Sequence, residues 1–179
     1  MQLVKASDVL DFWFSRSKDW FAKSPEFDEE IRSRFLALHE SAASGELEFW
    51  KQDHLGCLAL VIALDQFPRN LFRGSARAFA SDEMARATAR SILRRGWDQR
   101  LTKDERLFAY LPFEHSEALD DQELCCKLMA PLGTELLKWA EKHRDIIQRF
   151  GRFPHRNAAL GRESTPEEIE FLKQPGSGF

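Results

Sequence analysis

The sequence has little of what marks disulfides, zinc sites or membrane spans. Among 179 residues there are three cysteines, none in the Cys-x-x-Cys spacing of a structural zinc site. An odd number of cysteines cannot form a fully paired framework, so we expect reduced, buried thiols in a cytoplasmic protein. No apolar run approaches the roughly 18 residues of a membrane span. The chain also lacks an opening basic region followed by an apolar run, which argues against a secretory signal.

Familiar nucleotide-binding and catalytic motifs are missing as well. There is no Walker loop, no Gly-x-Gly-x-x-Gly and no nucleophile elbow. The tripeptide His143-Arg144-Asp145 occurs in kinase catalytic loops, but the other kinase motifs are absent and we interpret it as coincidence. A formal net charge of −3 gives no general attraction to nucleic acid or to an anionic membrane. The cofactor is therefore unknown, and neither nucleic acid nor a membrane is an expected partner.

What the sequence does contain is helical periodicity. Apolar residues recur at helical spacing, polar caps and Gly or Pro stops separate the periodic stretches, and no run of alternating β-branched residues is present. This pattern predicts an all-α fold of about eight helices in a single domain over residues 1–179. With their caps and stops, the expected helices run from Ser7 to Phe14, Ser24 to Gly45, about Asp53 to Gln66, Ser81 to Gly96, Thr102 to Pro112, Ser116 to Pro131, Thr134 to Gly151 and Thr165 to about Leu172.

Several of these helix ends depend on single residues. Pro68 is expected to stop the third helix and Pro112 the fifth, because proline cannot donate the helical hydrogen bond. Two capping boxes, Thr102 to Glu105 and Thr165 to Glu168, open the fifth and the last helix. Ser7, Ser24, Ser116 and Thr134 are further expected N-caps.

Two helix exits carry related polar segments. Gln66-Phe67-Pro68-Arg69-Asn70 resembles Arg152-Phe153-Pro154-His155-Arg156-Asn157, which suggests one shared polar site between helices. Arginines cluster at the two exits while lysines are nearly absent there, and arginine suits bidentate binding of a carboxylate or phosphate. These arginines are Arg69, Arg73, Arg144, Arg149, Arg152 and Arg156. The competing interpretation is an internal salt-bridge network, in which Asp65 with Arg69 and Asp145 with Arg149 are i, i+4 pairs. Both interpretations can hold at once.

A second set of polar residues could carry acid–base chemistry. His143 lies on the apolar stripe of its helix, so it is either a buried, hydrogen-bonded histidine or a base in an internal pocket. Glu114 and His115 precede the helix expected from Ser116, and Glu117 either complements the dipole of that helix or joins the site. Neither His-x-x-x-His nor Glu-x-x-His occurs, so only scattered residues could bind a metal, and we predict none.

Motifs over most of the chain resemble one known family. They are the stretches 8–14, 64–74, 111–117, 143–157 and 161–165, which include Leu111-Pro112-Phe113-Glu114-His115-Ser116-Glu117. The chain resembles a widespread, mostly bacterial family of uncharacterised proteins, catalogued as a domain of unknown function and placed among tetratricopeptide-repeat-like folds. The resemblance implies stacked antiparallel helix pairs, and it supplies no activity and no catalytic residues.

The sequence therefore predicts a helical protein with a buried Arg/His/Glu site that binds a small anionic molecule and could be catalytic. The catalytic candidates are His143, His115 and Glu114. The alternative is a peptide- or protein-binding scaffold of the helical-repeat kind, with a peptide as partner. The ligand-binding candidates are Asp65, Gln66, Arg69, Asn70, Arg73, Glu117, Arg144, Arg152, His155, Arg156 and Asn157.

Overall fold

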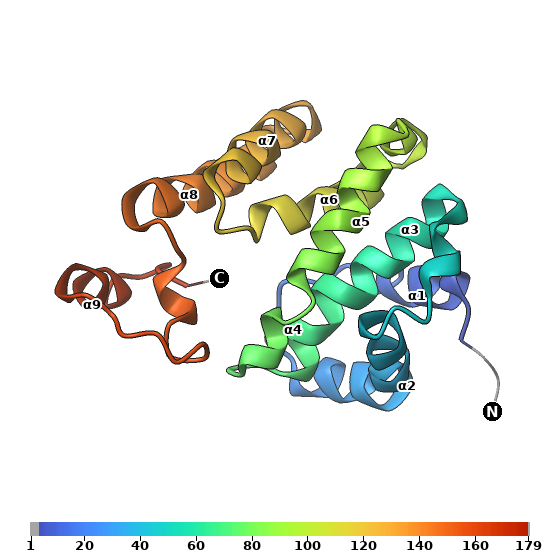
Figure 1. Cartoon of the computed structure of the whole chain (residues 1–179), viewed down its shortest axis with the longest axis horizontal. Coiled ribbons are helices and arrows are strands. Elements are labelled where there is room, and N and C mark those ends of the chain that lie inside the picture. Colours follow the sequence, from blue (N-terminus) through green and yellow to red (C-terminus); the bar gives the residue numbers. More distant parts are fainter. Residues whose placement is uncertain (1–3, 179) are drawn as a thin grey trace. The chain divides into compact units, whose positions relative to one another are not determined.

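The computed structural model describes residues 4–178, which are helices joined by turns (Figure 1). All eight expected helices are found, and no strand occurs within residues 4–178. The described residues form two compact units: unit 1 holds residues 4–73 and 77–112, and unit 2 holds residues 74–76 and 113–178. The expectation of a single domain remains a prediction. None of the described helices has the length and apolarity that crossing a bilayer requires.

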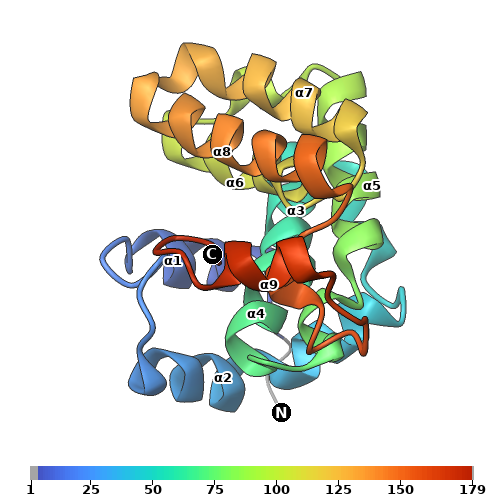
Figure 2. The same cartoon turned by 90° about the vertical axis from the view of Figure 1, so that its left-hand side faces the viewer.

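Unit 1 is built around one long helical rod. The rod consists of α3 (His54–Val61), a π-helical turn (Ile62–Gln66) and α4 (Phe67–Leu71), which follow one another without a break. Three helices pack against it, namely α1 (Ala6–Phe14), α2 (Pro25–Ala43) and α5 (Asp82–Arg94) (Figures 1 and 2). Every residue from 56 to 68 is buried, so the apolar middle of the expected third helix forms the centre of this core.

Pro68 does not end the third helix, contrary to the sequence prediction. The helix widens to a π-turn before the proline, and the Phe67 N–H donates to the carbonyl of Ile62, five residues back. Pro68 then takes the second position of α4, where a proline is tolerated, and helical structure continues to Leu71.

Side chains from other helices supply hydrogen bonds that the interrupted rod lacks. Pro68 has no N–H for the carbonyl of Leu64, and the Ser81 hydroxyl donates to that oxygen at 2.6 Å. The carbonyl of Ala63 accepts from Nδ1 of His39 at 2.8 Å. Because buried carbonyls need donors, these contacts allow the rod to pass through the core beyond the proline.

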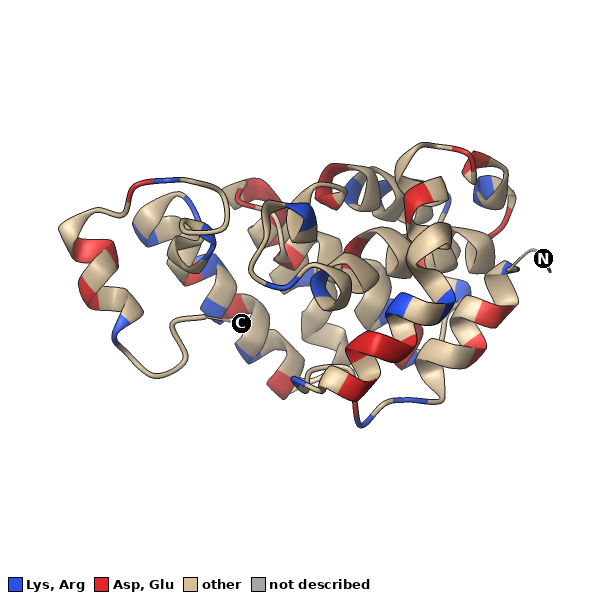
Figure 3. Ribbon diagram, turned by 90° about the horizontal axis from the view of Figure 1, so that it is seen from below, with Lys and Arg blue, Asp and Glu red and all other residues tan. Residues whose placement is uncertain are grey.

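Unit 2 contains a helix pair and a C-terminal segment. The helices α7 (Leu119–Met129) and α8 (Thr134–Phe150) lie side by side (Figure 2). A 3₁₀ turn at Pro154–Arg156 follows, and α9 (Pro166–Leu172) packs against that turn. Lys and Arg positions lie among Asp and Glu positions along the helices (Figure 3). The apolar core here includes Ile146, Ile147 and Phe153, with Phe150 and Phe171 packed against it.

The chain passes from unit 1 into unit 2 within α6 (Lys103–Glu114). The prediction that Pro112 ends this helix is wrong, because α6 continues through the proline to Glu114. Its start agrees with the capping box: the Thr102 N–H donates to the Glu105 carboxylate at 2.7 Å.

Other caps confirm or correct the sequence prediction. Ser24 accepts from the Phe27 N–H, and Thr165 forms a capping box with Glu168, both as expected. Ser7 is not a cap, because α1 starts one residue earlier and its N-cap is Lys5.

Ser116 and Thr134 are not N-caps either. The Ser116 hydroxyl donates to Asp121 at 2.7 Å, and α7 starts only at Leu119. Thr134 is the first residue of α8 because Gly133, at φ 139°, is the residue that breaks the chain direction. A φ in this region favours glycine, which explains the shift.

Two apolar residues within the expected third and seventh helices are exposed. Leu55 is 39% exposed in the first turn of α3, and Trp139 is 50% exposed on α8. The three cysteines are buried free thiols, as expected.

Candidate functional site

The candidate residues fall into two groups. Unit 1 contains those of the first helix exit, within residues 65–73, and unit 2 contains those from 114 onward. A site shared by the two exits therefore remains a prediction. The unit 2 group is Glu114, His115, Glu117, His143, Arg144, Arg152, His155, Arg156 and Asn157.

In unit 1, Arg69 is bound by two carboxylates of this chain. Its guanidinium contacts both oxygens of Asp82, at 2.9 and 3.0 Å, and lies 3.3 Å from Asp65. Asp65 is fully buried and also accepts from Gln66 at 2.6 Å. Burial alone would lower the pKa of Arg69, but the two negative charges outweigh it and raise that pKa. The expected Asp65–Arg69 pair is thus confirmed.

The next two candidates of unit 1 share one partner on α2. The Asn70 side-chain amide donates to Asp28 at 2.7 Å, and Arg73 donates to both oxygens of the same carboxylate, at 2.5 and 2.8 Å. The polar residues of this exit therefore tie α4 to α2, which agrees with the interpretation as an internal network.

In unit 2, Arg152 and Asn157 converge on one buried carboxylate. Arg152 donates to both oxygens of Glu168, at 2.7 and 2.8 Å, and Asn157 donates at 3.2 Å. The Thr165 N–H donates to the same carboxylate at 2.8 Å. These donors, Arg152 first, lower the pKa of Glu168 to about 2 although burial opposes the change.

Glu117 holds the segment after α8 in place. It accepts from Arg162 at 2.7 and 2.9 Å, and from the Phe153 N–H at 2.8 Å. Burial would raise the pKa of Glu117, but these donors lower it. The helix-dipole interpretation is wrong for this residue, because α7 begins two residues later, at Leu119. Arg162 was not among the sequence candidates.

The two arginines on α8 have different partners from those expected. Arg144 donates to Asp145 at 2.9 Å, and Arg149 donates to Glu167 of α9 at 2.9 Å. The expected i, i+4 pair of Asp145 with Arg149 is therefore wrong. The partner on α9 lies 18 residues along the chain from Arg149, beyond the reach of a local rule.

Three of the remaining candidates of unit 2 contact one aromatic ring. Phe153 is fully buried, and the His143 ring meets it edge-on with centroids 5.7 Å apart. The His155 ring lies 5.6 Å from it, and the Arg156 guanidinium lies 4.6 Å from its centroid. We call these four residues together with Glu114 the Phe153 cluster.

His143 is a neutral imidazole in this cluster. It is 5% exposed, and its Nδ1 lies 2.8 Å from the Trp139 carbonyl and 3.6 Å from a Glu114 oxygen. The carbonyl can only accept, so the neutral ring carries its proton on Nδ1 and its lone pair on Nε2. Burial is the main reason that the pKa of His143 is lowered to about 3; the hydrogen bond to the Trp139 carbonyl opposes the shift, and the nearby charge of Arg156 adds a smaller lowering.

Gln122 is a polar residue of this region that the sequence did not reveal. It is fully buried, and its amide nitrogen donates to the carbonyls of Glu114 and Ser116 at 2.6 and 2.7 Å. Its Oε1 has no hydrogen-bond partner among residues 4–178. Reversing the amide would set its oxygen against those carbonyls, so this orientation is the chemically sensible one. The one feature of the sequence that could have indicated this role is an amide residue beside Cys125 on a helix face that is buried.

Cys125 lies against the same glutamate but is not an activated nucleophile. Its Sγ is 3.9 Å from a Glu114 carboxylate oxygen. Burial, and then the charge of Glu114, raise the pKa of Cys125, so the thiol stays protonated. Residues 4–178 contain no group of three or more His, Cys, Asp or Glu side chains placed to hold a metal ion.

The fold and these contacts define an all-helical protein with buried Arg–carboxylate networks and one buried, neutral histidine, His143. The chain belongs to the family described as bacterial protein of unknown function (DUF924), whose model matches residues 9–176. It is similar to the solved structure of a protein of unknown function, ATU0120 from Agrobacterium tumefaciens. The identity is 48%, the match covers 94% of this chain and 96% of that chain, and the TM-score is 0.91. No curated protein matches.

These comparisons confirm the family resemblance and name neither ligand nor reaction. The all-α fold is confirmed by the helices described above. The tetratricopeptide-repeat-like stacking that the resemblance implied remains a prediction.

Proposed function

We propose that the Phe153 cluster binds a small anionic molecule carrying a carboxylate or phosphate. The observation that carries this proposal is the gathering of one guanidinium and two imidazoles around a single buried ring, next to Glu114. An arginine stacked on an aromatic face keeps the N–H groups at its edge directed sideways, which suits bidentate capture of an anion.

Among the arginine candidates, Arg156 is the one we assign to the anion. Arg156 is 7% exposed, and its guanidinium lies 4.6 Å from the centroid of Phe153. The rings of His143 and His155 contact the same phenyl ring, so the Arg156 guanidinium supplies the positive charge that an anion would meet there.

We propose that the cluster binds a ligand, and we do not propose that it acts as a general base. A histidine whose pKa is lowered to about 3 is a weak base near neutral pH, so we propose no base catalysis by His143. The Oε1 of Gln122, which has no hydrogen-bond partner among residues 4–178, would accept a hydrogen bond from a donor on the ligand. Such a ligand would carry an anionic group and at least one hydroxyl, amine or protonated acid. Roles for His115 and Glu114 in catalysis remain proposals.

The test compares two arginine variants of the same unit by thermal denaturation. Inorganic phosphate, glycolate and 2-phosphoglycolate are titrated against the wild type, Arg156→Gln and Arg144→Gln. Arg144 pairs with its neighbour Asp145 at the surface, so its variant controls for loss of one positive charge. A ligand that binds only the folded state raises the melting temperature. At a concentration one hundred times its Kd, it adds about 2.7 kcal/mol to the free energy of unfolding. We expect this rise in the wild type and the control and its loss in Arg156→Gln; equal shifts in all three would contradict the proposal.

A further inference from the structure

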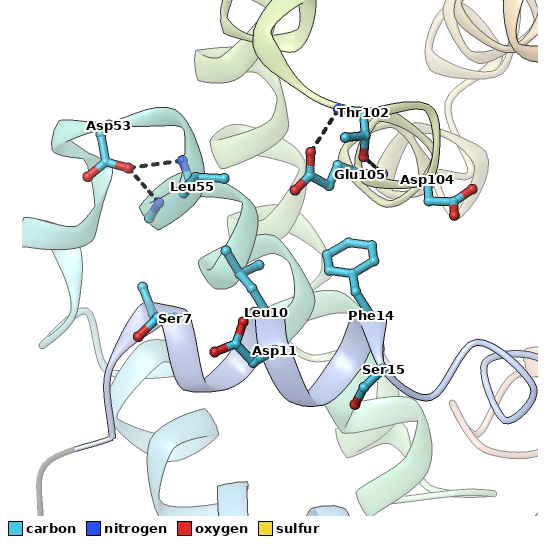
Figure 4. Close-up of a pocket in the computed structure, with 12 residues that line it drawn as sticks. Ser7, Leu10, Asp11, Phe14, Ser15, Asp53, Leu55, Thr102, Asp104 and Glu105 are labelled. Carbon is cyan, nitrogen blue, oxygen red and sulfur yellow. Dashed lines mark hydrogen bonds between the residues drawn. The ribbon is translucent and has the colours of Figure 1, made fainter.

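Unit 1 has an open hollow of about 740 Å³ that none of the candidate residues lines. Its walls are α1 and the first turns of α3 and α6 (Figure 4). Leu10 and Phe14 point from α1 into the space between those two helix starts, and Leu55 lies on the α3 side. Leu55 is 39% exposed, so the hollow has an apolar floor open to solvent.

The rim of this hollow is acidic and no lining residue is basic. Two of its carboxylates are used locally: Asp53 caps α3, and Glu105 belongs to the capping box of α6. The carboxylates of Asp11 and Asp104 make no hydrogen bond or ion pair with any residue between 4 and 178. These two exposed residues line the hollow from different helices, and the Asp104 carboxylate points outward at its edge (Figure 4), so both charges are available to a cationic partner.

The apolar floor adjoins a group of aromatic rings of which Phe21 is exposed and Phe108 is buried. Phe14 contacts Trp20 and Phe108, with centroids 5.8 Å away in each case. Phe21 is 71% exposed and stacks on Phe108 at 6.2 Å. A large exposed apolar surface rimmed by polar groups is typical of an interaction site.

We infer that this hollow docks a basic amphipathic helical segment of a partner protein. Apolar side chains at i, i+3 or i+4 and i+7 of such a segment would cover Leu10, Phe14 and Leu55. Lysines or arginines flanking that stripe would lie opposite Asp11 and Asp104, which complements the charge of the rim. A small polycation would need only the carboxylates, so the apolar floor is what favours a peptide. This inference is independent of the anion site proposed in unit 2.

The experiment measures binding of a labelled probe peptide to the full chain by fluorescence anisotropy. The probe carries leucines on one helical stripe and lysines beside it. Its length is about 15 residues, at which an isolated helix is only marginally stable. Two comparison peptides replace either the leucines by serine or the lysines by glutamate, and spermine serves as a polycation without an apolar face.

Matched variants separate the rim from the floor. Asp104→Asn is paired with Glu83→Gln, because both residues are exposed and second in their helices, α6 and α5. Leu55→Ser is paired with Leu119→Ser, since both leucines are 39% exposed in a first helical turn. We expect the double variant Asp11→Asn with Asp104→Asn to weaken probe binding about fivefold to tenfold. This loss should be smaller in high salt, which screens the charges. Leu55→Ser should weaken it about fivefold, with both controls within about twofold of wild type.

Three results would overturn the inference. One is probe binding that is no tighter than that of the glutamate or serine peptide. Another is equal losses in the variants and their matched controls. The third is spermine binding that depends on Asp11 and Asp104 while no variant of Leu55 matters, which would assign the rim to small polycations. Circular dichroism of each variant confirms that its helices are intact before binding is compared.

Discussion

In unit 1 the segment Phe67–Asn70 continues a helix, whereas in unit 2 the related segment Phe153–Asn157 follows the end of one. Ahead of Pro68 the rod widens into a π-turn, and the side chains of His39 on α2 and of Ser81, just before α5, donate hydrogen bonds to its carbonyls. Ahead of Pro154 the helix α8 is closed by Gly151, at φ 67°, and a 3₁₀ turn follows. The residues preceding the shared Phe-Pro therefore decide the backbone path.

The same difference decides what the polar residues do. In unit 1, Arg69 is enclosed by Asp65 and Asp82, so its charge is used in holding helices together. In unit 2, the turn brings His155 and Arg156 against the Phe153 ring. Similar sequences thus lead to a structural network in one unit and to a cluster suited to a ligand in the other.

The largest expected effect comes from breaking the network of unit 1. Arg69→Met leaves Asp65 buried without its arginine, and an uncompensated buried charge costs about 3–5 kcal/mol of unfolding free energy. Urea denaturation followed by tryptophan fluorescence measures the change. Arg73→Gln, at a more exposed pair, is the control and should cost less than about 1 kcal/mol. Equal costs would mean that burial does not distinguish the two arginines.

A smaller loss is expected from the buried carboxylate of unit 2. Glu168→Gln weakens the bonds to Arg152 and the Thr165 N–H, so the melting temperature at pH 7 should fall by about 5–10 °C. Because the folded pKa of Glu168, about 2, is below its ordinary value, its stabilisation is present above pH 4.5 and lost as the pH falls toward 2. The deficit of the variant should therefore shrink in acid. Glu167→Gln, an exposed neighbour paired with Arg149, is the control.

Ser81 and Pro68 give a sharper test of the rod. Ser81→Ala leaves the Leu64 carbonyl without its donor, which should cost roughly 1–2 kcal/mol. In a Pro68→Ala background the alanine N–H can donate to that carbonyl, so the same serine change should cost less. A double-mutant cycle in urea measures this coupling. Strictly additive costs would show that the hydroxyl does not substitute for the missing helical hydrogen bond.

Helices and local caps were predictable because they depend on residues close in sequence. The box from Thr165 to Glu168 spans one helical turn, and the burial of His143 follows from its place on an apolar stripe. Ser116 failed as a cap because its hydroxyl bonds Asp121 instead, a choice between two local partners that composition does not settle.

The partners of the arginines were not predictable in the same way. Arg162 meets Glu117 from 45 residues away, and the donor that lets the rod pass Pro68 is Ser81, 17 residues from the carbonyl it serves. Such pairs depend on how helices pack, and helical periodicity does not encode packing. The hollow of unit 1 was missed for the same reason, since Asp11 and Asp104 come together only in the folded unit.

The smallest change in the free energy of unfolding at neutral pH is expected for His143→Gln. This variant is tested through the pH dependence of its stability. The folded pKa of His143 is lowered to about 3, whereas the unfolded chain titrates near 6.5, so between these values the unfolded chain binds more protons. The stability due to this residue is therefore complete above pH 6.5 and falls as the pH drops below that value. The total loss is about 1.4 kcal/mol for each unit by which the folded and unfolded pKa values differ. In urea titrations at pH 7.5, 6 and 5, the variant should lose less stability in acid than the wild type. Parallel losses would mean that His143 is not held neutral, and the anion proposed at the Phe153 cluster would then meet a charged imidazole instead of a neutral one.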